Sequence, residues 1–261
     1  MTRDDAEAGA RPLVDVRGLA CGHRLGAPGE VLALERFDLE LAAGDLVGLV
    51  GPGGSGKTSL LRVLAGLDAP AAGAAVVAGV DLAAAGPREL DAYRRRVAGF
   101  VGQPPERSLL PSLTASENVQ VALLVADVAR EERRERAAEL LESLRLGGRS
   151  RHRPGELPGG ERLRLALAAA LAGRPALLLV DEPAGELDRD TARTVLFDLE
   201  SLLRRQGTAA LIASRGMELE PFVDRVRRLA GPAAPAPLPL PAPAAPLPLV
   251  GPPPPVRETP R

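Results

Sequence analysis

The stretch GLVGPGGSGKTSLLRVLAG, residues 48–66, decides the fold class of this chain. Its centre fits the pattern G-x-x-x-x-G-K-[S/T] at every fixed position, after an apolar run and before a helical pattern. Glycines let a backbone wrap around phosphate groups, and the start of the following helix adds partial positive charge. A glycine-rich turn without a ligand is the alternative. The residues expected to bind phosphate are Gly51, Pro52, Gly53, Gly54, Ser55, Gly56, Lys57, Thr58 and Ser59.

Lys57 is the only lysine in the chain, because the other 32 of the 33 basic residues are arginine. Arginine is a broad planar fork, whereas lysine is a compact charge on a flexible stem that fits inside a tight loop. In this position Lys57 can reach the β- and γ-phosphates of a nucleotide, and the Thr58 hydroxyl can ligate Mg²⁺. The stretch therefore predicts binding of a magnesium-complexed nucleotide.

Composition limits the remaining function classes. The 261 residues suit one large α/β domain or two small ones, and a net charge of −1 argues against general binding of nucleic acid. The single cysteine, Cys21, excludes an internal disulfide. Residues 231–250 have the length of a membrane helix, but proline recurs through them and prevents helix formation in lipid. Any membrane role is therefore expected to come through a partner.

Short apolar runs alternate with helical patterns between residues 13 and 230, which predicts a mainly parallel sheet covered on both faces. We expect residues 1–12 to be a disordered leader rather than a signal peptide, since they lack an apolar segment. Residues 231–261 hold 13 of the 26 prolines and predict a disordered Pro/Ala-rich tail, with a docking segment of the PxxP type as the alternative. The expected strands are 13–17, 45–51, 74–79, 97–102, 176–183, 208–213 and about 223–229. One helix is expected directly after Gly56, and others at about 87–95 and 190–205. Residues 114–146 are expected to form a helical insertion.

Two carboxylates end an apolar run in ALLLVDEP, residues 176–183. At the carboxyl end of a parallel strand, Asp181 and Glu182 would face the phosphate site. Asp181 would hold Mg²⁺ through water, and Glu182 would polarise an attacking water as general base. Taken alone, the pattern also fits a strand end that meets solvent; after a complete phosphate loop, it favours a nucleotide-hydrolysing site.

With these motifs placed, residues 13–229 resemble the ATPase subunits of ATP-binding cassette (ABC) transporters, most closely the lipoprotein-release and macrolide-export type. RRRVAGFVGQPPERSLLPSLTASENV (94–119) is similar to the family's Q-loop region, where Gln103 would contact Mg²⁺ and link the site to the membrane subunit. LPGGERLRLALAAAL (157–171) is similar to its signature segment, and Asp188 takes the position of the D-loop aspartate. The resemblance implies an α/β fold of the P-loop NTPase class, with a mainly parallel sheet core, an antiparallel β edge and a helical insertion subdomain at about 104–172.

The resemblance also implies the mode of action. In this family two cassettes pair head to tail, and each ATP lies between the P-loop of one and the signature of the other. Hydrolysis separates them and drives a membrane permease subunit, which would dock at the helical insertion and the Q-loop. The chain would then lie in the cytoplasm, peripheral on the inner face of the cell membrane, in a homodimer or in a heterodimer with another ABC ATPase.

Three positions depart from the family pattern. In the signature, usually Leu-Ser-Gly-Gly-Gln, Pro158 replaces a serine whose hydroxyl bonds the γ-phosphate, Glu161 replaces the glutamine, and the amides of Gly159 and Gly160 remain. Arg215 stands where the subgroup has its switch histidine; it could pair with the γ-phosphate but cannot shuttle a proton, and a solvated loop arginine is the alternative. His23 lies near the position of the aromatic that stacks on adenine, and a plain loop histidine is equally consistent.

These departures predict slow hydrolysis. They also leave a second function open, a nucleotide-gated binding or regulatory module that signals through a membrane partner with little turnover. A DNA-repair or translation cassette is disfavoured, because the insertion has no long coiled coil and the chain has no second cassette. The run Arg133–Arg136 is expected to be a solvated helical face, with a contact to the membrane partner as the alternative.

Overall fold

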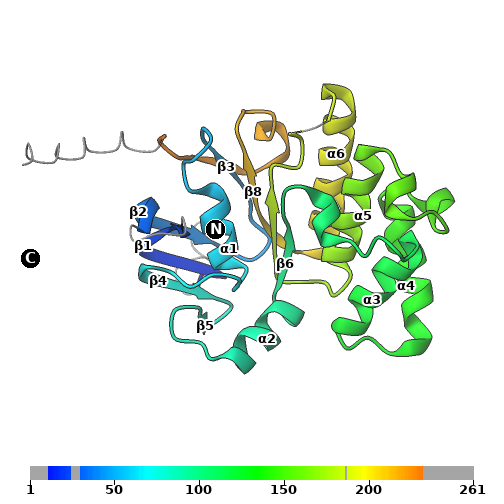
Figure 1. Ribbon diagram of the computed structural model, residues 1–261, viewed down its shortest axis with the longest axis horizontal. Coiled ribbons are helices and arrows are strands. Elements are labelled where there is room, and N and C mark those ends of the chain that lie inside the picture. The colour runs from blue at the N-terminus through cyan, green and yellow to red at the C-terminus, as the bar shows by residue number, and fades with distance from the viewer. Residues whose placement is uncertain (1–10, 25–29, 186, 232–261) are drawn as a thin grey trace, which may run out of the picture.

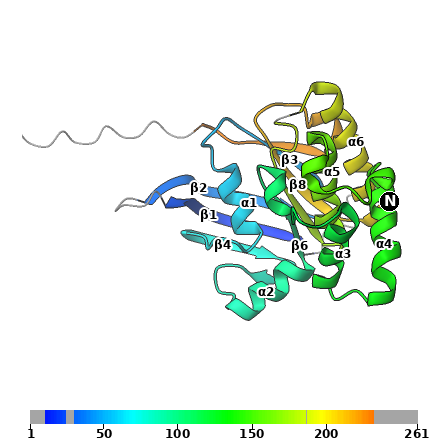
Figure 2. The same ribbon diagram turned by 45° about the vertical axis from the view of Figure 1, so that its right-hand side comes forward.

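The structure is a computed structural model that describes residues 11–24, 30–185 and 187–231. Most of the predicted leader and nearly all of the predicted tail lie outside these residues. The described chain forms two β-sheets with α1 (Lys57–Leu64) between them, and the helical insertion stands on the far side of the larger sheet (Figures 1 and 2).

The larger sheet is entirely parallel, with strand order β6-β7-β8-β3-β9. All residues of β3, β7 and β8 are buried, which explains why these strands read as uninterrupted apolar runs. The predicted parallel core is confirmed, and the expected strands at 45–51, 97–102, 176–183, 208–213 and 223–229 all lie in it. Its members are β3 (Leu46–Val50), β6 (Ala98–Val101), β7 (Leu177–Asp181), β8 (Ala209–Ser214) and β9 (Arg225–Arg228).

The antiparallel strands form a sheet of their own, larger than the edge expected from the sequence, in the order β2-β1-β4-β5. The 12-residue strand β2 (Glu30–Leu41) was not predicted. Its second half does carry a strand signal, since buried Phe37 and Leu39 alternate with exposed Asp38 and Glu40. The other members are β1 (Val14–Arg24), β4 (Ala72–Val77) and β5 (Val80–Asp81).

Side chains cap the starts of two helices, α3 at Thr114 and α6 at Asp188. Thr114 and Glu117 form a reciprocal capping box at the start of α3, and α6 ends at Gly207, whose φ of 68° suits glycine. The remaining helices are α2 (Pro87–Arg96), α3 (Ala115–Val125), α4 (Arg130–Ser143), α5 (Gly159–Leu171) and α6 (Arg189–Gln206), with short 3₁₀ turns at Pro105–Ser108, Gly147–Arg149, Pro154–Glu156 and Glu220–Phe222.

Helices α3 and α4 make up the predicted insertion, and they share one apolar core with α5, α6 and one face of the parallel sheet. The bounds 104–172 for a separate helical subdomain stay a prediction. On α4, Arg134 is exposed, whereas Arg133 donates to the Val128 carbonyl at 2.8 Å and Arg136 lies 3.6 Å from Glu132. These contacts fit the expected solvated face of this helix.

A buried ion pair that the sequence did not reveal joins α5 to α6. Asp198 accepts a short hydrogen bond from Arg164 Nη1, which also donates to the Leu144 carbonyl at 3.0 Å. The more exposed Arg145 completes the group, with Nη2 at 2.9 Å from Asp198 Oδ1. Removing one partner of such a pair leaves a buried charge without compensation.

Replacing Asp198 by alanine is therefore expected to lower the free energy of unfolding by about 3–5 kcal/mol. The double variant Arg164→Met, Asp198→Leu is expected to recover a large part of this loss, because no buried charge is left unpaired. Urea unfolding followed by circular dichroism measures both. Asp190→Ala, at an exposed position of the same helix, serves as the control and should change stability by about 1 kcal/mol or less.

Candidate functional site

The glycine-rich loop between β3 and α1 is shaped by close backbone contacts. Gly56, which directly precedes α1, has a φ of 87°. A Cβ atom placed on it would lie 2.8 Å from the Ala33 carbonyl oxygen and 2.9 Å from Leu34 Cβ. No side chain fits there, so the antiparallel sheet presses directly on the loop and fixes its position at the carboxyl end of β3.

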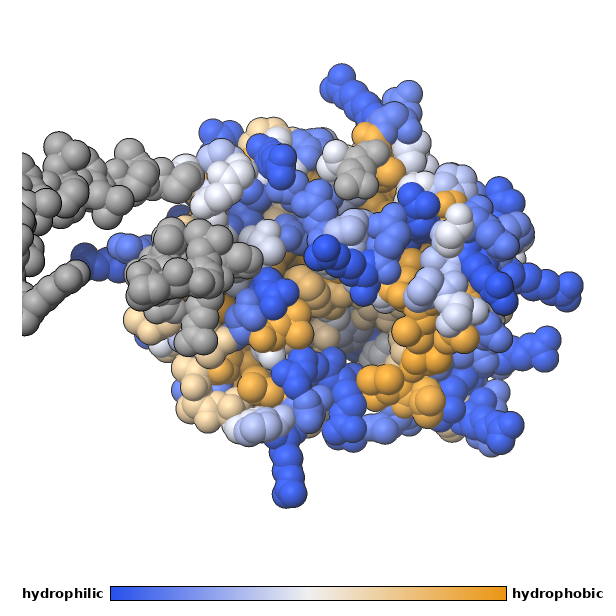
Figure 3. Space-filling view, in the orientation of Figure 1, coloured by the Kyte–Doolittle hydropathy of each residue, from blue (hydrophilic) through white to orange (hydrophobic). Residues whose placement is uncertain are grey.

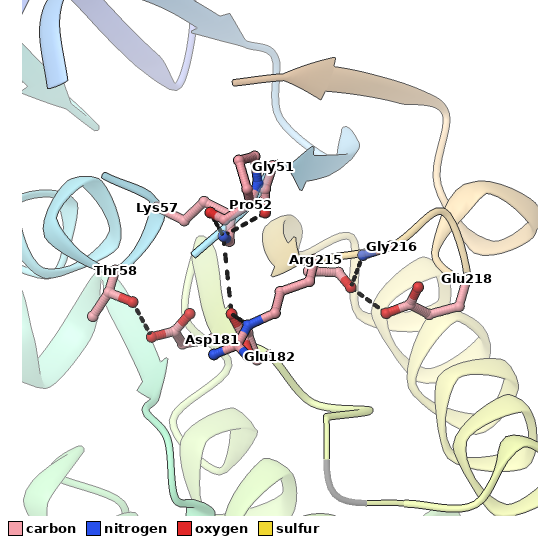
Figure 4. Close-up of polar contacts among 10 residues, drawn as sticks. Gly51, Pro52, Lys57, Thr58, Asp181, Glu182, Arg215, Gly216 and Glu218 are labelled. Atoms are coloured by element: carbon pink, nitrogen blue, oxygen red, sulfur yellow. Dashed lines mark hydrogen bonds and ion pairs between the residues drawn. The ribbon is translucent and has the colours of Figure 1, made fainter. Parts of the chain in front are cut away.

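Lys57 lies at the centre of the loop and is nearly fully buried, with 4% of its side chain exposed. Its ammonium group donates to the carbonyl oxygens of Gly51 at 2.7 Å and Pro52 at 2.9 Å, and lies 3.9 Å from Glu182 Oε1 (Figure 4). Burial lowers the pKa of Lys57, and the carboxylates of Glu182 and Asp181 oppose that shift. The ammonium thus holds the loop closed around itself, close to the two acids predicted to share its site.

Thr58 and Asp181 are brought together from positions far apart in the sequence. The Thr58 hydroxyl donates to Asp181 Oδ2 at 2.7 Å, from the first turn of α1 to the last residue of β7. Burial raises the pKa of Asp181, and the hydrogen bond from Thr58 partly offsets this. Asp181 Oδ1 and the Ser55 hydroxyl are buried without a hydrogen-bond partner in the described structure. Such unpartnered polar atoms fit a site that binds a polar ligand.

Glu182 follows β7 and points at two cations (Figure 4). Arg215 Nε donates to Glu182 Oε1 at 2.9 Å, and this is the same oxygen that faces Lys57. Arg215 directly follows β8, which lies between β7 and β3, so the sheet order brings it into the site. The head group is paired and not merely solvated, although 67% of the arginine side chain is exposed.

Gln103 comes two residues after β6, which is the neighbour of β7. It lines a cavity of about 280 Å³ together with Glu182 and Gly159. Gly185 lies beside both polar side chains, since a Cβ placed on it would be 3.5 Å from Gln103 Nε2 and 3.7 Å from Glu182 Oε2. The structure thus brings Gln103 next to the predicted general base.

The signature segment lies at the start of α5. Pro158 directly precedes the helix, and Gly160 packs so closely on α6 that a Cβ would lie 2.6 Å from Thr191 Cγ2. Glu161 is 3.0 Å from Arg149, so an ion pair within the chain balances its charge. Among the hydrogen bonds and ion pairs of the described residues, none joins residues 158–161 to the loop 51–58.

Asp188 has a structural role that the resemblance to the family did not indicate. Its side chain accepts a hydrogen bond from the Thr191 backbone amide at 2.9 Å and so caps α6, and the hydrogen bonds from Thr191 lower its pKa. His23 lies in β1 opposite Val31, and its side chain falls outside the described part of the structure. The predicted adenine contact therefore stays a prediction.

Ser214 and Glu218 were missed as members of the site. The Ser214 hydroxyl forms a short hydrogen bond with Glu218 and accepts one from the Gly216 amide at 3.2 Å, while its carbonyl accepts from Gly51 at 3.2 Å. These bonds fix the backbone on both sides of Arg215. A serine and a glutamate four residues apart, directly after an apolar strand, were the available signal.

The described residues contain no group of three or more His, Cys, Asp or Glu side chains able to hold a metal ion by themselves. Among the helices in the described ranges, none is long and apolar enough to cross a membrane.

Comparison with known families matches residues 34–185, more than half of the chain, to the family model described as "ABC transporter". The chain belongs to the ABC transporter family. It is an ATP-binding cassette, the ATPase subunit of such a transporter, and the predicted resemblance, fold class and enzyme class are confirmed.

Among its relatives is the lipoprotein-releasing system ATP-binding protein LolD 2 of Caulobacter vibrioides, 44% identical over 215 residues, which cover 82% of this chain and 93% of the relative. LolD of Pseudomonas syringae pv. tomato is 42% identical over 221 residues, or 85% of this chain and 96% of the relative. Among solved structures, the ATP-binding cassette MJ0796, a dimer in a post-hydrolysis state bound to ADP and Pi, has a TM-score of 0.75 at 30% identity and covers 84% of this chain and 96% of its own.

Proposed function

We propose that this ABC ATPase hydrolyses magnesium-complexed ATP at the cluster formed by Lys57, Thr58, Asp181 and Glu182. The observation that carries the proposal is that two stretches more than a hundred residues apart meet here, with Thr58 bonded to Asp181 and Lys57 facing Glu182 (Figure 4). A buried cation in a glycine-rich loop beside two carboxylates is suited to hold a triphosphate and to activate water next to it.

The residues divide by chemistry. Lys57 and the amides of the loop 51–56 would bind phosphate oxygens, and Glu182 would take the proton of the attacking water. Mg²⁺ fits the Thr58 hydroxyl, Asp181 and Gln103, because hard oxygen donors suit this ion and Asp181 Oδ1 is buried without a partner. When bound, the ion would neutralise phosphate charge.

The relatives' names and the dimeric cassette structure support a place in a larger assembly. We infer that two cassettes pair head to tail and drive a permease subunit of the lipoprotein-release type, with the chain on the cytoplasmic face of the membrane. A homodimer would carry Pro158 in both of its nucleotide sites. A heterodimer with a cassette that has the usual signature serine would carry it in only one.

A cavity of about 230 Å³ between β6 and the insertion, lined among others by Arg95, Ala122 and Val125, offers a place for the permease. Val125, which lines this cavity, is about half exposed, and so are Leu124 beside it in the chain and Leu110 before α3. Figure 3 shows apolar surface on both sides of a hollow near the middle of this face. Apolar surface of this kind is typical of a contact with another protein.

The hydrolysis rate is expected to be low, because the contact contributed by the signature serine is missing. Pro158 has neither a hydroxyl nor a backbone N–H to offer to a phosphate. Losing one charge-stabilising contact costs about 10²–10³ in rate. Steady-state phosphate release, measured with the chain alone and with its permease in membranes, tests the function. Release no faster than that of uncatalysed ATP in either setting would favour the alternative, a nucleotide-gated module.

Replacing Pro158 by serine is expected to raise phosphate release at least about tenfold, since it restores a hydroxyl where a contact worth about 10²–10³ is lost. Serine is also well suited to the position before a helix, so the fold should tolerate it. The matched control is Pro158→Ala, which restores the backbone N–H, as serine does, but adds no hydroxyl, and it should leave release within about twofold. An equal gain in both variants would show that the hydroxyl is not the missing group.

A further inference from the structure

Two cationic side chains face the single carboxylate of Glu182. Lys57 Nζ and Arg215 Nε both face its Oε1, at 3.9 and 2.9 Å. The carboxylate itself is nearly buried, with 10% of its side chain exposed, and its backbone amide donates to the Ala213 carbonyl at 2.9 Å. The acid is therefore the fixed member of the group.

Arg215 is the movable member. Its backbone is anchored by the bonds that Ser214 makes to Gly51, Gly216 and Glu218, whereas 67% of its side chain is exposed. An ion pair with such an exposed head group contributes little stability and is easily exchanged for another anion. A phosphate group offers the guanidinium stronger, charge-assisted hydrogen bonds than a single carboxylate oxygen does.

We propose that Arg215 is a latch on the general base: it occupies Glu182 while the site lacks a γ-phosphate and moves to the γ-phosphate when ATP binds. The exchange frees Glu182 to accept a proton from water. ADP has no γ-phosphate to compete for the guanidinium, so it leaves the latch closed. This inference rests on the proposed function and adds to it a means by which the site distinguishes triphosphate from diphosphate.

The latch predicts that residues 182 and 215 are energetically coupled in nucleotide binding. The experiment is calorimetric titration of the full chain with Mg²⁺ and either the imido analogue of ATP, which is not hydrolysed, or ADP. Arg215→Ala is expected to weaken binding of the analogue about tenfold, as loss of a charge-assisted bond implies, and to change ADP binding by less than about twofold. Arg193→Ala, at an exposed position of α6, is the control and should change neither affinity.

The decisive comparison places Glu182→Gln in both backgrounds. When Arg215 is present, Glu182→Gln removes two costs of binding: the repulsion between the Glu182 carboxylate and the phosphate, and the breaking of the ion pair between Glu182 and Arg215. In the Arg215→Ala background, the same substitution removes only the repulsion. We expect its gain in analogue affinity to be about three- to fivefold larger when Arg215 is present. Equal gains in both backgrounds would overturn the latch while nucleotide binding itself stands; absence of analogue binding by the wild-type chain would overturn the latch and the proposed function together.

Discussion

Replacing Lys57 by alanine is expected to weaken Mg·ATP binding about 10- to 100-fold and to reduce phosphate release by a factor of about 10² or more. The ammonium group is the one buried cation in the described part of the phosphate loop, and the carbonyls of Gly51 and Pro52 that it bridges would lose their donor. Isothermal titration calorimetry and a phosphate-release assay measure the two effects.

Lys57→Arg is the matched variant for this test. It keeps the charge but replaces a compact ammonium by a broad fork, which the space between two carbonyl oxygens at 2.7 and 2.9 Å does not accommodate. We expect it to lose activity nearly as fully as alanine does. Unchanged affinity in a folded Lys57→Ala chain would contradict the assignment of the loop to phosphate binding.

Replacing Glu182 by glutamine is expected to reduce phosphate release by a factor of about 10²–10⁴ while the chain still binds ATP. The amide keeps the size of the side chain but cannot accept a proton from water at neutral pH. Release and binding are measured as for Lys57. Glu89→Gln, exposed on α2, is the control and should stay within about twofold of the parent.

Equal phosphate release from Glu182→Gln and the parent chain would mean that Glu182 is not the base. That result would favour the second function, in which the chain binds nucleotide and signals with little turnover. The two substitutions thus separate nucleotide binding from hydrolysis. Replacing Lys57 is expected to weaken both, whereas replacing Glu182 is expected to reduce chiefly hydrolysis.

Local sequence rules were sufficient for the parallel core and for the glycine-rich loop between β3 and α1. The strands β3, β7 and β8 are buried along their whole length, and only uninterrupted apolar runs fit such positions. The second half of strand β2 was missed because polar and apolar residues alternate over residues 37–41, which lack the continuous run that marked β3, β7 and β8. A period-2 reading of residues 37–41 would have indicated it.

Contacts between distant side chains were beyond the reach of a single sequence. The pair of Arg164 and Asp198 spans 34 positions, and that of Glu182 and Arg215 spans 33. Both depend on which strands and helices become neighbours, and neither residue type is informative alone. The position of Arg215 was predicted from the family pattern, but its contact with Glu182 follows only from the order of the strands.

The contact between α5 and α6 has a mechanical consequence. Because Thr191 fills the space beside Gly160 and Asp198 grips Arg164, the two helices cannot easily slide past each other. A displacement of the helical insertion would therefore be transmitted through α5 and α6 to the turn that carries Glu182, with little deformation at the contact between the two helices. The rigidity of the contact between α5 and α6, more than the affinity for a partner, would then determine how much of a movement of the insertion reaches the site around Glu182.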